Sequence, residues 1–328
     1  MDQNVFLRES ESGFKWVAKR DIDPSKSTFA FKINLTLRSS KYAIFNQPIY
    51  IVSYIGNAQP AGAGKKPGVV ELYKSALQKA VRRKKAAEAV EITHRLWELR
   101  PFELVRRLMI IMCEDVIITE DYVWLSWLLM ALSKGYKLVE WDYQRLISLV
   151  DWMCRCSVRD TLRYHDDGMY DCELPEKPTE TAVLKAILVR IGYGGMLGDV
   201  KMLENFYDLW WKRFERGVEP FSRPVVHIVY HPIPNPVMLE AVDQHCSKLC
   251  ETIEGKTDYP LDQIKKLIWN HRSSVNYRKF IWVADPDIIT VEADESYEKR
   301  HPAPGSDFDA IKDLADEYSR LFIQSYGV

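Results

Sequence analysis

The sequence has no long hydrophobic run and little cysteine. The longest apolar stretch, residues 123–132, is interrupted by Ser126 and is far shorter than the roughly 20 residues of a membrane-spanning helix. The first sixteen residues lack the apolar core that a secretory signal peptide needs. Six cysteines are few for 328 residues and are typical of reduced thiols in an intracellular protein. We therefore expect a cytoplasmic or nuclear chain with no membrane partner.

The chain also has almost no net charge, because its formal charge at pH 7 is −1. The charges are unevenly distributed along it. Residues 65–107 contain twelve Lys or Arg against five Asp or Glu, whereas residues 285–328 contain four against eleven. This asymmetry predicts a basic face that attracts anions and an acidic C-terminal end.

Residues 28–38 (TFAFKINLTLR) alternate between apolar and polar side chains, which predicts a half-buried strand. The run 49–55 (IYIVSYI) predicts a second, more buried strand. A stretch rich in Gly, Ala and Pro follows, and from there the periodicity is helical. There is no internal repeat and no low-complexity tract. The expected fold is mainly α, a helical bundle or array with a small N-terminal β unit.

Several residues mark where helices begin and end. Pro101 is expected as the first residue of one helix, Thr119 as the N-cap of the next, and Gly135 just after its end. A further helix is expected to begin at Asn235 and Pro236 and to end at Gly255. Other expected helices cover about 141–163, 180–191, 200–216, 261–272 and a final segment near the C-terminus. The expected units are a β unit (1–56), a linker loop (57–68), a first helical domain (69–165) and a second helical domain with short β segments (166–328).

The segment 69–135 contains an ordered series of motifs. It has Ser75-Ala76-Leu77, the basic Lys79 and Arg82, an Ala-rich helix, Pro101, then Arg106-Arg107-Leu108 and Glu114-Asp115. In this order the motifs resemble the C-terminal helical collar of the clamp-loader clade of AAA+ proteins, in particular the replication-associated recombination protein A family. The resemblance implies a domain that assembles oligomers beside DNA.

The motor that such a collar serves is missing from the sequence. Only 68 residues precede the segment, and a phosphate-binding Walker A loop needs Gly, four residues, then Gly-Lys-Ser/Thr. Around Gly64-Lys65, position 59 is Gln and position 66 is Lys, so ATP hydrolysis is not expected. The second half of the chain, in 241–250 and 264–279, is faintly similar to uncharacterised proteins of large DNA viruses.

Two basic sets are candidates for contacts with nucleic acid. At helical spacing, Lys79, Arg82 and Arg83 would share a face able to meet a phosphate backbone. The second set, interleaved with Trp269, suits single-stranded nucleic acid; it contains Lys265, Lys266 and Arg272. In both cases the plain alternative is open, namely a solvated charged face or a core helix.

One acidic loop is a candidate metal site. It places His165, Asp166, Asp167 and Asp171 within seven residues, a set of oxygen and imidazole ligands that suits Mg²⁺ or Mn²⁺. The alternative is an acidic turn around Asp167-Gly168. No catalytic residues can be assigned from the sequence, and no cofactor is expected unless this loop binds a metal.

Three functions remain open at this point. The first is a non-catalytic oligomerising or scaffold protein of DNA replication, DNA repair or a viral nucleoprotein, which binds nucleic acid non-specifically through a basic helix. The second is a metal-dependent hydrolase or nuclease centred on residues 165–173. The third is a structural or assembly protein that binds protein partners and has no nucleic-acid role.

Overall fold

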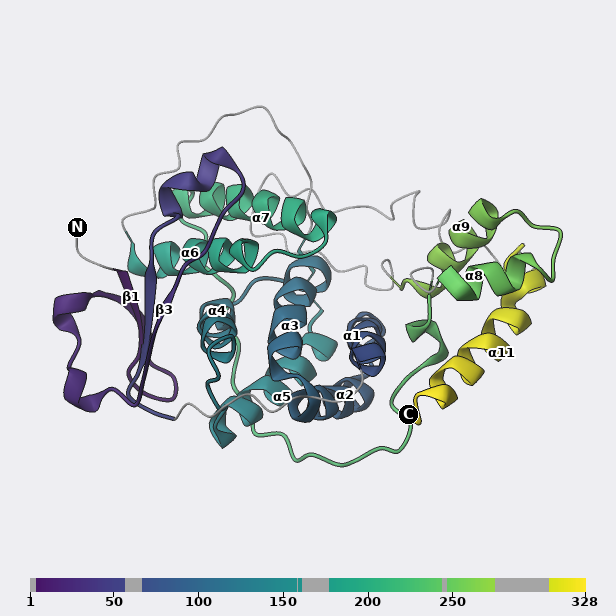
Figure 1. The fold of residues 1–328 in the computed structure, drawn as a ribbon, viewed down its shortest axis with the longest axis horizontal. Coiled ribbons are helices and arrows are strands. Elements are labelled where there is room, and N and C mark those ends of the chain that lie inside the picture. Colours follow the sequence, from purple (N-terminus) through teal and green to yellow (C-terminus); the bar gives the residue numbers. More distant parts are fainter. Residues whose placement is uncertain (1–3, 57–66, 158, 161–176, 244–246, 275–306) are drawn as a thin grey trace.

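The computed structural model describes residues 4–56, 67–157, 159–160, 177–243, 247–274 and 307–328. Within them the chain is mainly α-helical, with a small N-terminal β-sheet at one end (Figure 1), so the expected fold class is confirmed. The predicted metal-site loop, 165–173, lies outside the described residues. None of the described helices is both long enough and apolar enough to cross a membrane.

The sheet has four strands in the order β2-β1-β4-β3. β1 and β2 form an antiparallel hairpin, β1 runs parallel to β4, and β3 is an antiparallel edge strand. The sequence analysis found β3 and β4 but missed the hairpin. The strands are β1 (Asn4–Arg8), β2 (Phe14–Ala18), β3 (Phe29–Ile33) and β4 (Ile49–Ser53). Short 3-10 turns join them at η1 (Lys19–Asp21), η2 (Pro24–Lys26) and η3 (Ser40–Phe45).

The strand expected over 28–38 ends at Ile33, so its second half was predicted wrongly. The backbone of Leu37 bonds to a side chain instead of a neighbouring strand. Its N–H donates to Oδ1 of Asn46 at 2.7 Å, and its carbonyl accepts from Nδ2 of Asn46 at 3.3 Å. Because one amide satisfies both backbone groups of Leu37, this residue needs no neighbouring strand, and its side chain is buried against the helices.

Five helices follow the sheet and form the centre of the molecule. They are α1 (Pro67–Arg82), α2 (Ala86–Leu99), α3 (Pro101–Asp115), α4 (Asp121–Leu132) and α5 (Glu140–Arg155). Pro101 opens α3 as expected, and Gly135 follows α4 with a left-handed φ of 81°. The N-cap of α4 is Glu120 and not the expected Thr119, which lies one residue earlier and accepts from the N–H of Asp121 through its Oγ1 at 3.2 Å.

The sheet and the helices share one hydrophobic core. Phe6 of β1 and Ile51 of β4 are fully buried in it, and the indole of Trp127 in α4 donates to the carbonyl of Phe6 at 3.1 Å. The core also continues across the domain boundary expected at residue 165, because α6 (Pro178–Gly192) packs on α4. The β unit is thus one layer of a larger body.

Beyond α6 and α7 (Leu197–Glu215), the chain crosses the helical body as an extended strap, residues 218–238, which passes beneath α5 and α2 in Figure 1. The helix expected to begin at Asn235 is therefore wrong; only the single turn η4 (Leu239–Ala241) and the short α8 (Ser247–Glu254) form there. The guanidinium of Arg95 donates to the carbonyls of Ile233 and Pro234, both at 3.1 Å. These contacts hold the extended chain against α2 up to the point where the helix was expected to begin.

A smaller C-terminal unit lies at the other end of the molecule from the sheet (Figure 1). It consists of α8, α9 (Leu261–Arg272) and α11 (Asp309–Ser325). Helix α9 was predicted at these bounds. The unit is joined to the central body through η4, which packs on both α1 and α11.

Candidate functional site

The first predicted basic set does not form an exposed face. Lys79 is 3% exposed and Arg82 is 6% exposed. Nζ of Lys79 lies 2.5 Å from Oδ2 of Asp243, and Nε of Arg82 lies 2.6 Å from Oδ1 of Asp115. The expectation that these side chains meet a phosphate backbone from solvent is therefore wrong. The sequence could not reveal it, because Asp243 follows Lys79 by 164 residues.

Arg83 completes the same contact between α1 and the C-terminal unit. Its guanidinium lies 2.9 Å from Glu240 and donates to Oγ of Ser274 at 2.7 Å. Arg82 also donates to the carbonyl of Ser273 at 2.8 Å. The basic end of α1 thus holds the C-terminal unit in place, which is a structural role.

The second predicted basic set is divided between interior and surface. Arg272 is 2% exposed, donates to Oγ of Ser319 at 2.7 Å and forms an ion pair with Asp316. Lys265 is half-buried, and Lys266 is exposed. Of these three residues, only Lys266 presents its side chain fully to solvent, so they do not act together as one basic surface.

The predicted metal ligands His165, Asp166, Asp167 and Asp171 all lie outside the described residues. Among the residues that are described, no three His, Cys, Asp or Glu side chains are placed to hold a metal ion together. The metal site remains a prediction from the sequence.

The described structure brings a different group of cations together. Two adjoining pockets of about 460 and 1660 Å³ form one cleft between α1, α3, the start of α7 and the C-terminal unit. Seven cationic and five anionic side chains line it. The cations are Lys74, Lys79, Arg82, Arg106, Arg107, Arg190 and Lys248, and the anions are Glu71, Glu103, Glu114, Asp199 and Asp243. The cleft therefore has an excess of positive charge.

Arg107 lies where the two pockets meet, since it lines both. It is half-buried, and its Nη1 donates to Oε1 of Gln78 at 3.2 Å. That amide is held in turn by its own donation to Glu114 at 2.7 Å and Asp115 at 2.8 Å. Arg107 makes no ion pair within the described residues. Its guanidinium is positioned by a neutral partner, which leaves the positive charge available to a ligand.

Arg190 and Arg106 adjoin it. Arg190 is 1% exposed and binds only carbonyls in the described structure, with Nη1 donating to Gly194 at 2.7 Å and Nε to Arg106 at 3.4 Å. Arg106 donates to the carbonyl of Gly194 at 3.1 Å, and its Nε is buried without a hydrogen-bond partner. Burial lowers the pKa of Arg190 because the charged form is poorly solvated there. An anion at this point would therefore be stabilised.

A glycine-rich turn completes this end of the cleft. Gly194 and Gly195 have φ values of 65° and 151°, conformations that a side chain would strain, and they lead directly into α7. Met196, the N-cap of α7, provides no side-chain hydrogen bond to the first turn. The first N–H groups of a helix attract anions when no side chain caps them.

The anionic side of the cleft includes Glu114. Burial, and then repulsion from the carboxylate of Asp115, raises the pKa of Glu114 above its usual value, against the opposing effect of Arg82. Glu114 also forms an ion pair with Arg82 at 3.1 Å, which offsets part of its negative charge in the cleft.

Comparisons with models of known protein families, with curated proteins and with solved structures find no match for this chain. The resemblance of residues 69–135 to a clamp-loader collar stays a prediction. In the sequence, Arg106-Arg107 is a motif of that resemblance, and Arg190 carries no signal of a site. The signal that could have pointed to the cleft was the run Gly192–Asp199, which contains four glycines, two of them, Gly194 and Gly195, between α6 and α7.

Proposed function

We propose that this protein is a binding or scaffold protein whose ligand carries phosphate groups, and that these groups bind in the cleft around Arg107. The observation that supports the proposal most strongly is that Arg107 and Arg190 line one cleft and neither makes an ion pair within the described residues. A buried guanidinium without a counter-charge is unfavourable, so binding an anion there would offset a cost already present in the free protein.

Phosphate suits this site better than a single carboxylate does. A guanidinium fork matches two oxygens of a carboxylate or of a phosphate, but a phosphate has further oxygens for additional donors. The uncapped start of α7 adds backbone donors and a partial positive charge at the same end of the cleft. Arginines from two helices together with a helix N-terminus can bind more than one phosphate oxygen at once.

Single-stranded nucleic acid is the ligand we propose, because the sequence analysis favours a nucleic-acid partner. The proposal moves the contact from the exposed face expected on α1 to the cleft. The same proposal includes self-association through the collar-like helices. It also includes a role in DNA replication, DNA repair or a viral nucleoprotein. Both parts are supported only by the resemblance of residues 69–135.

The test is fluorescence anisotropy of a labelled single-stranded oligonucleotide with wild type, Arg107→Ala and the control Arg320→Ala. Arg320 is an exposed arginine on α11, outside the cleft. Arg107→Ala should weaken binding about tenfold, as expected for a loss of about 1.4 kcal/mol. It should also reduce the slope of log affinity against log salt concentration by the amount that one phosphate contact contributes. Arg320→Ala should change neither the affinity nor this slope.

An equal loss of affinity in the two variants would indicate that nucleic acid binds through the overall surface charge. It would contradict binding in the cleft. Unchanged binding by Arg107→Ala would remove this residue from the site, and wild type that fails to bind at low salt would remove nucleic acid as the ligand. Charge reversal at Arg82 is unsuitable for this test, since it would place another carboxylate beside Glu114 and Asp115 and disturb the fold.

A further inference from the structure

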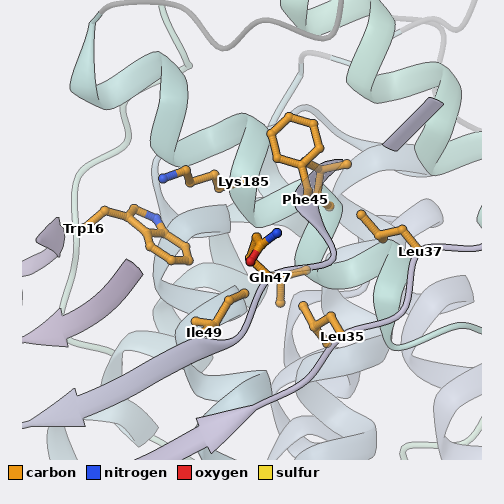
Figure 2. A pocket seen from close by; sticks show the side chains of 9 residues that line it. Trp16, Leu35, Leu37, Phe45, Gln47, Ile49 and Lys185 are labelled. Atoms are coloured by element: carbon orange, nitrogen blue, oxygen red, sulfur yellow. The ribbon is translucent and has the colours of Figure 1, made fainter. Parts of the chain in front are cut away.

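A second pocket, away from the basic cleft, lies between the sheet and α6. It has a volume of about 500 Å³ and is walled by Leu35, Leu37, Phe45, Ile49 and Leu188 (Figure 2). A largely apolar lining with a few polar groups at its edge is the usual character of small-molecule sites. The pocket exists because the chain leaves the sheet after Ile33, which brings Leu35 and Leu37 opposite α6.

One lysine stands at the edge of this apolar wall. The ammonium of Lys185, on α6, lies 4.6 Å from the centre of the Trp16 ring. Lys185 forms no ion pair within the described residues, and no carboxylate lines the pocket. A π face offsets only a part of the cost of burying an ammonium group. Burial lowers the pKa of Lys185, as expected for a cation that lacks a counter-charge.

A second donor at the same edge also lacks an acceptor. Nε1 of Trp16 is buried and has no hydrogen-bond partner among the residues that the structure describes. The indole is held in place from its other side, where it stacks on Phe6 at 4.4 Å. In Figure 2 the nitrogen atoms of Trp16 and Lys185 point to the same side of the pocket. A buried indole N–H normally has an acceptor, so the missing group is an oxygen that can serve both donors.

We propose that this pocket binds a small apolar molecule bearing one carboxylate, with the carboxylate paired to Lys185 and Trp16 and the apolar part among Leu35, Leu37 and Phe45. A carboxylate provides the negative charge that Lys185 lacks and the acceptor that Trp16 lacks. The aliphatic and aromatic walls provide the burial that holds the rest of the molecule. This site is separate from the basic cleft and does not depend on the function proposed for it.

The experiment compares octanoate with 1-octanol by isothermal titration calorimetry, because the two share a chain length and differ in charge. Wild type should bind octanoate about tenfold more tightly than 1-octanol, the ratio given by about 1.4 kcal/mol from one charge-assisted contact. Lys185→Met keeps the length of the side chain and removes its charge. It should lose this preference for octanoate while retaining its affinity for 1-octanol.

Lys201→Met is the matched control, since Lys201 is exposed on α7 and does not line the pocket. It should retain the wild-type preference. A thermal melt of Lys185→Met, which should be at least as stable as wild type, confirms that any loss of octanoate binding is not a loss of fold. The proposal is overturned if wild type binds the two compounds equally, if it binds neither, or if Lys185→Met keeps the preference.

Discussion

Arg8 and Asp142 form a bidentate ion pair in which both side chains are 0% exposed. Nη1 of Arg8 lies 3.0 Å from Oδ2 of Asp142, and Nη2 lies 2.9 Å from Oδ1. Asp142 also accepts from the N–H of Val139 at 3.1 Å, which caps α5, while Arg8 donates to the hydroxyl of Tyr136 at 2.8 Å. This pair joins the end of β1 to the beginning of α5 across the shared core.

We predict that Asp142→Ala lowers the free energy of unfolding by about 3–5 kcal/mol, because it leaves the Arg8 guanidinium buried without a counter-charge. Urea denaturation measures the change. Lys15→Ala is the control, since Lys15 pairs with Glu9 on the surface, where both side chains are about half exposed, and should cost less than about 1 kcal/mol. Similar losses in the two variants would contradict a special role for the buried pair.

A second prediction concerns Glu91, which fastens the strap to α2. Glu91 is 4% exposed and accepts from the hydroxyl of Tyr230 at 2.6 Å, from Nε of Arg95 at 2.6 Å and from the N–H of Ile233 at 3.2 Å. We expect Glu91→Gln to lower the free energy of unfolding by about 1–3 kcal/mol at pH 7, because these donors favour a charged acceptor.

This loss should depend on pH in a defined direction. Burial opposes the ionisation of Glu91, but the hydrogen bonds from Tyr230, Arg95 and Ile233 together hold its pKa below the ordinary value of 4.5. A lowered pKa in the folded state gives stability that is present above pH 4.5 and is lost as the pH falls through the folded value. Wild type and Glu91→Gln should therefore converge in stability below pH 4.5. Glu88→Gln, on the same helix, is the control for the loss at pH 7 and should cost less than about 0.5 kcal/mol.

A third prediction concerns the end of α1. Lys84 has a φ of 59°, its N–H donates to the carbonyl of Val81 at 3.1 Å, and the N–H of Lys85 donates to Ala80 at 2.9 Å. This is the hydrogen-bond pattern of a helix end that favours glycine at the left-handed position. Lys84→Gly should raise the free energy of unfolding by about 1 kcal/mol in a urea titration. Lys85→Gly, where φ is −90°, should give no gain.

The elements that the sequence predicted well are those whose causes are local. Pro101 opens α3, and Gly135 and Gly217 follow the ends of α4 and α7 with left-handed φ values, because a proline or glycine acts on its own segment. Where a distant partner decided the outcome, the prediction was wrong. Beyond the strand end at Ile33, Asn46 bonds the backbone of Leu37, and Arg95 holds the chain extended at Ile233 and Pro234.

The same distinction explains the candidate sites. The helical spacing correctly placed Lys79 and Arg82 near each other on one helix. Whether their side chains contact solvent or carboxylates of the protein depends on residues much later in the chain, such as Asp243. The cleft around Arg107 combines α3 with α6 and α7, and the pocket at Lys185 depends on where the chain leaves the sheet. Neither combination has a periodic signal in the sequence.

The strap acts as a cover on the helical body. Its attachments are made largely through side chains, at Arg223 to Asp121, at Ser148 to the N–H of Val226 and at Glu91 to Tyr230. The C-terminal unit does not depend on them for its position, because Lys79, Arg82 and Arg83 hold it directly against α1. Loss of a strap contact should therefore expose Val90 and Ile147 beneath Ile228 and Tyr230 without moving the C-terminal unit away.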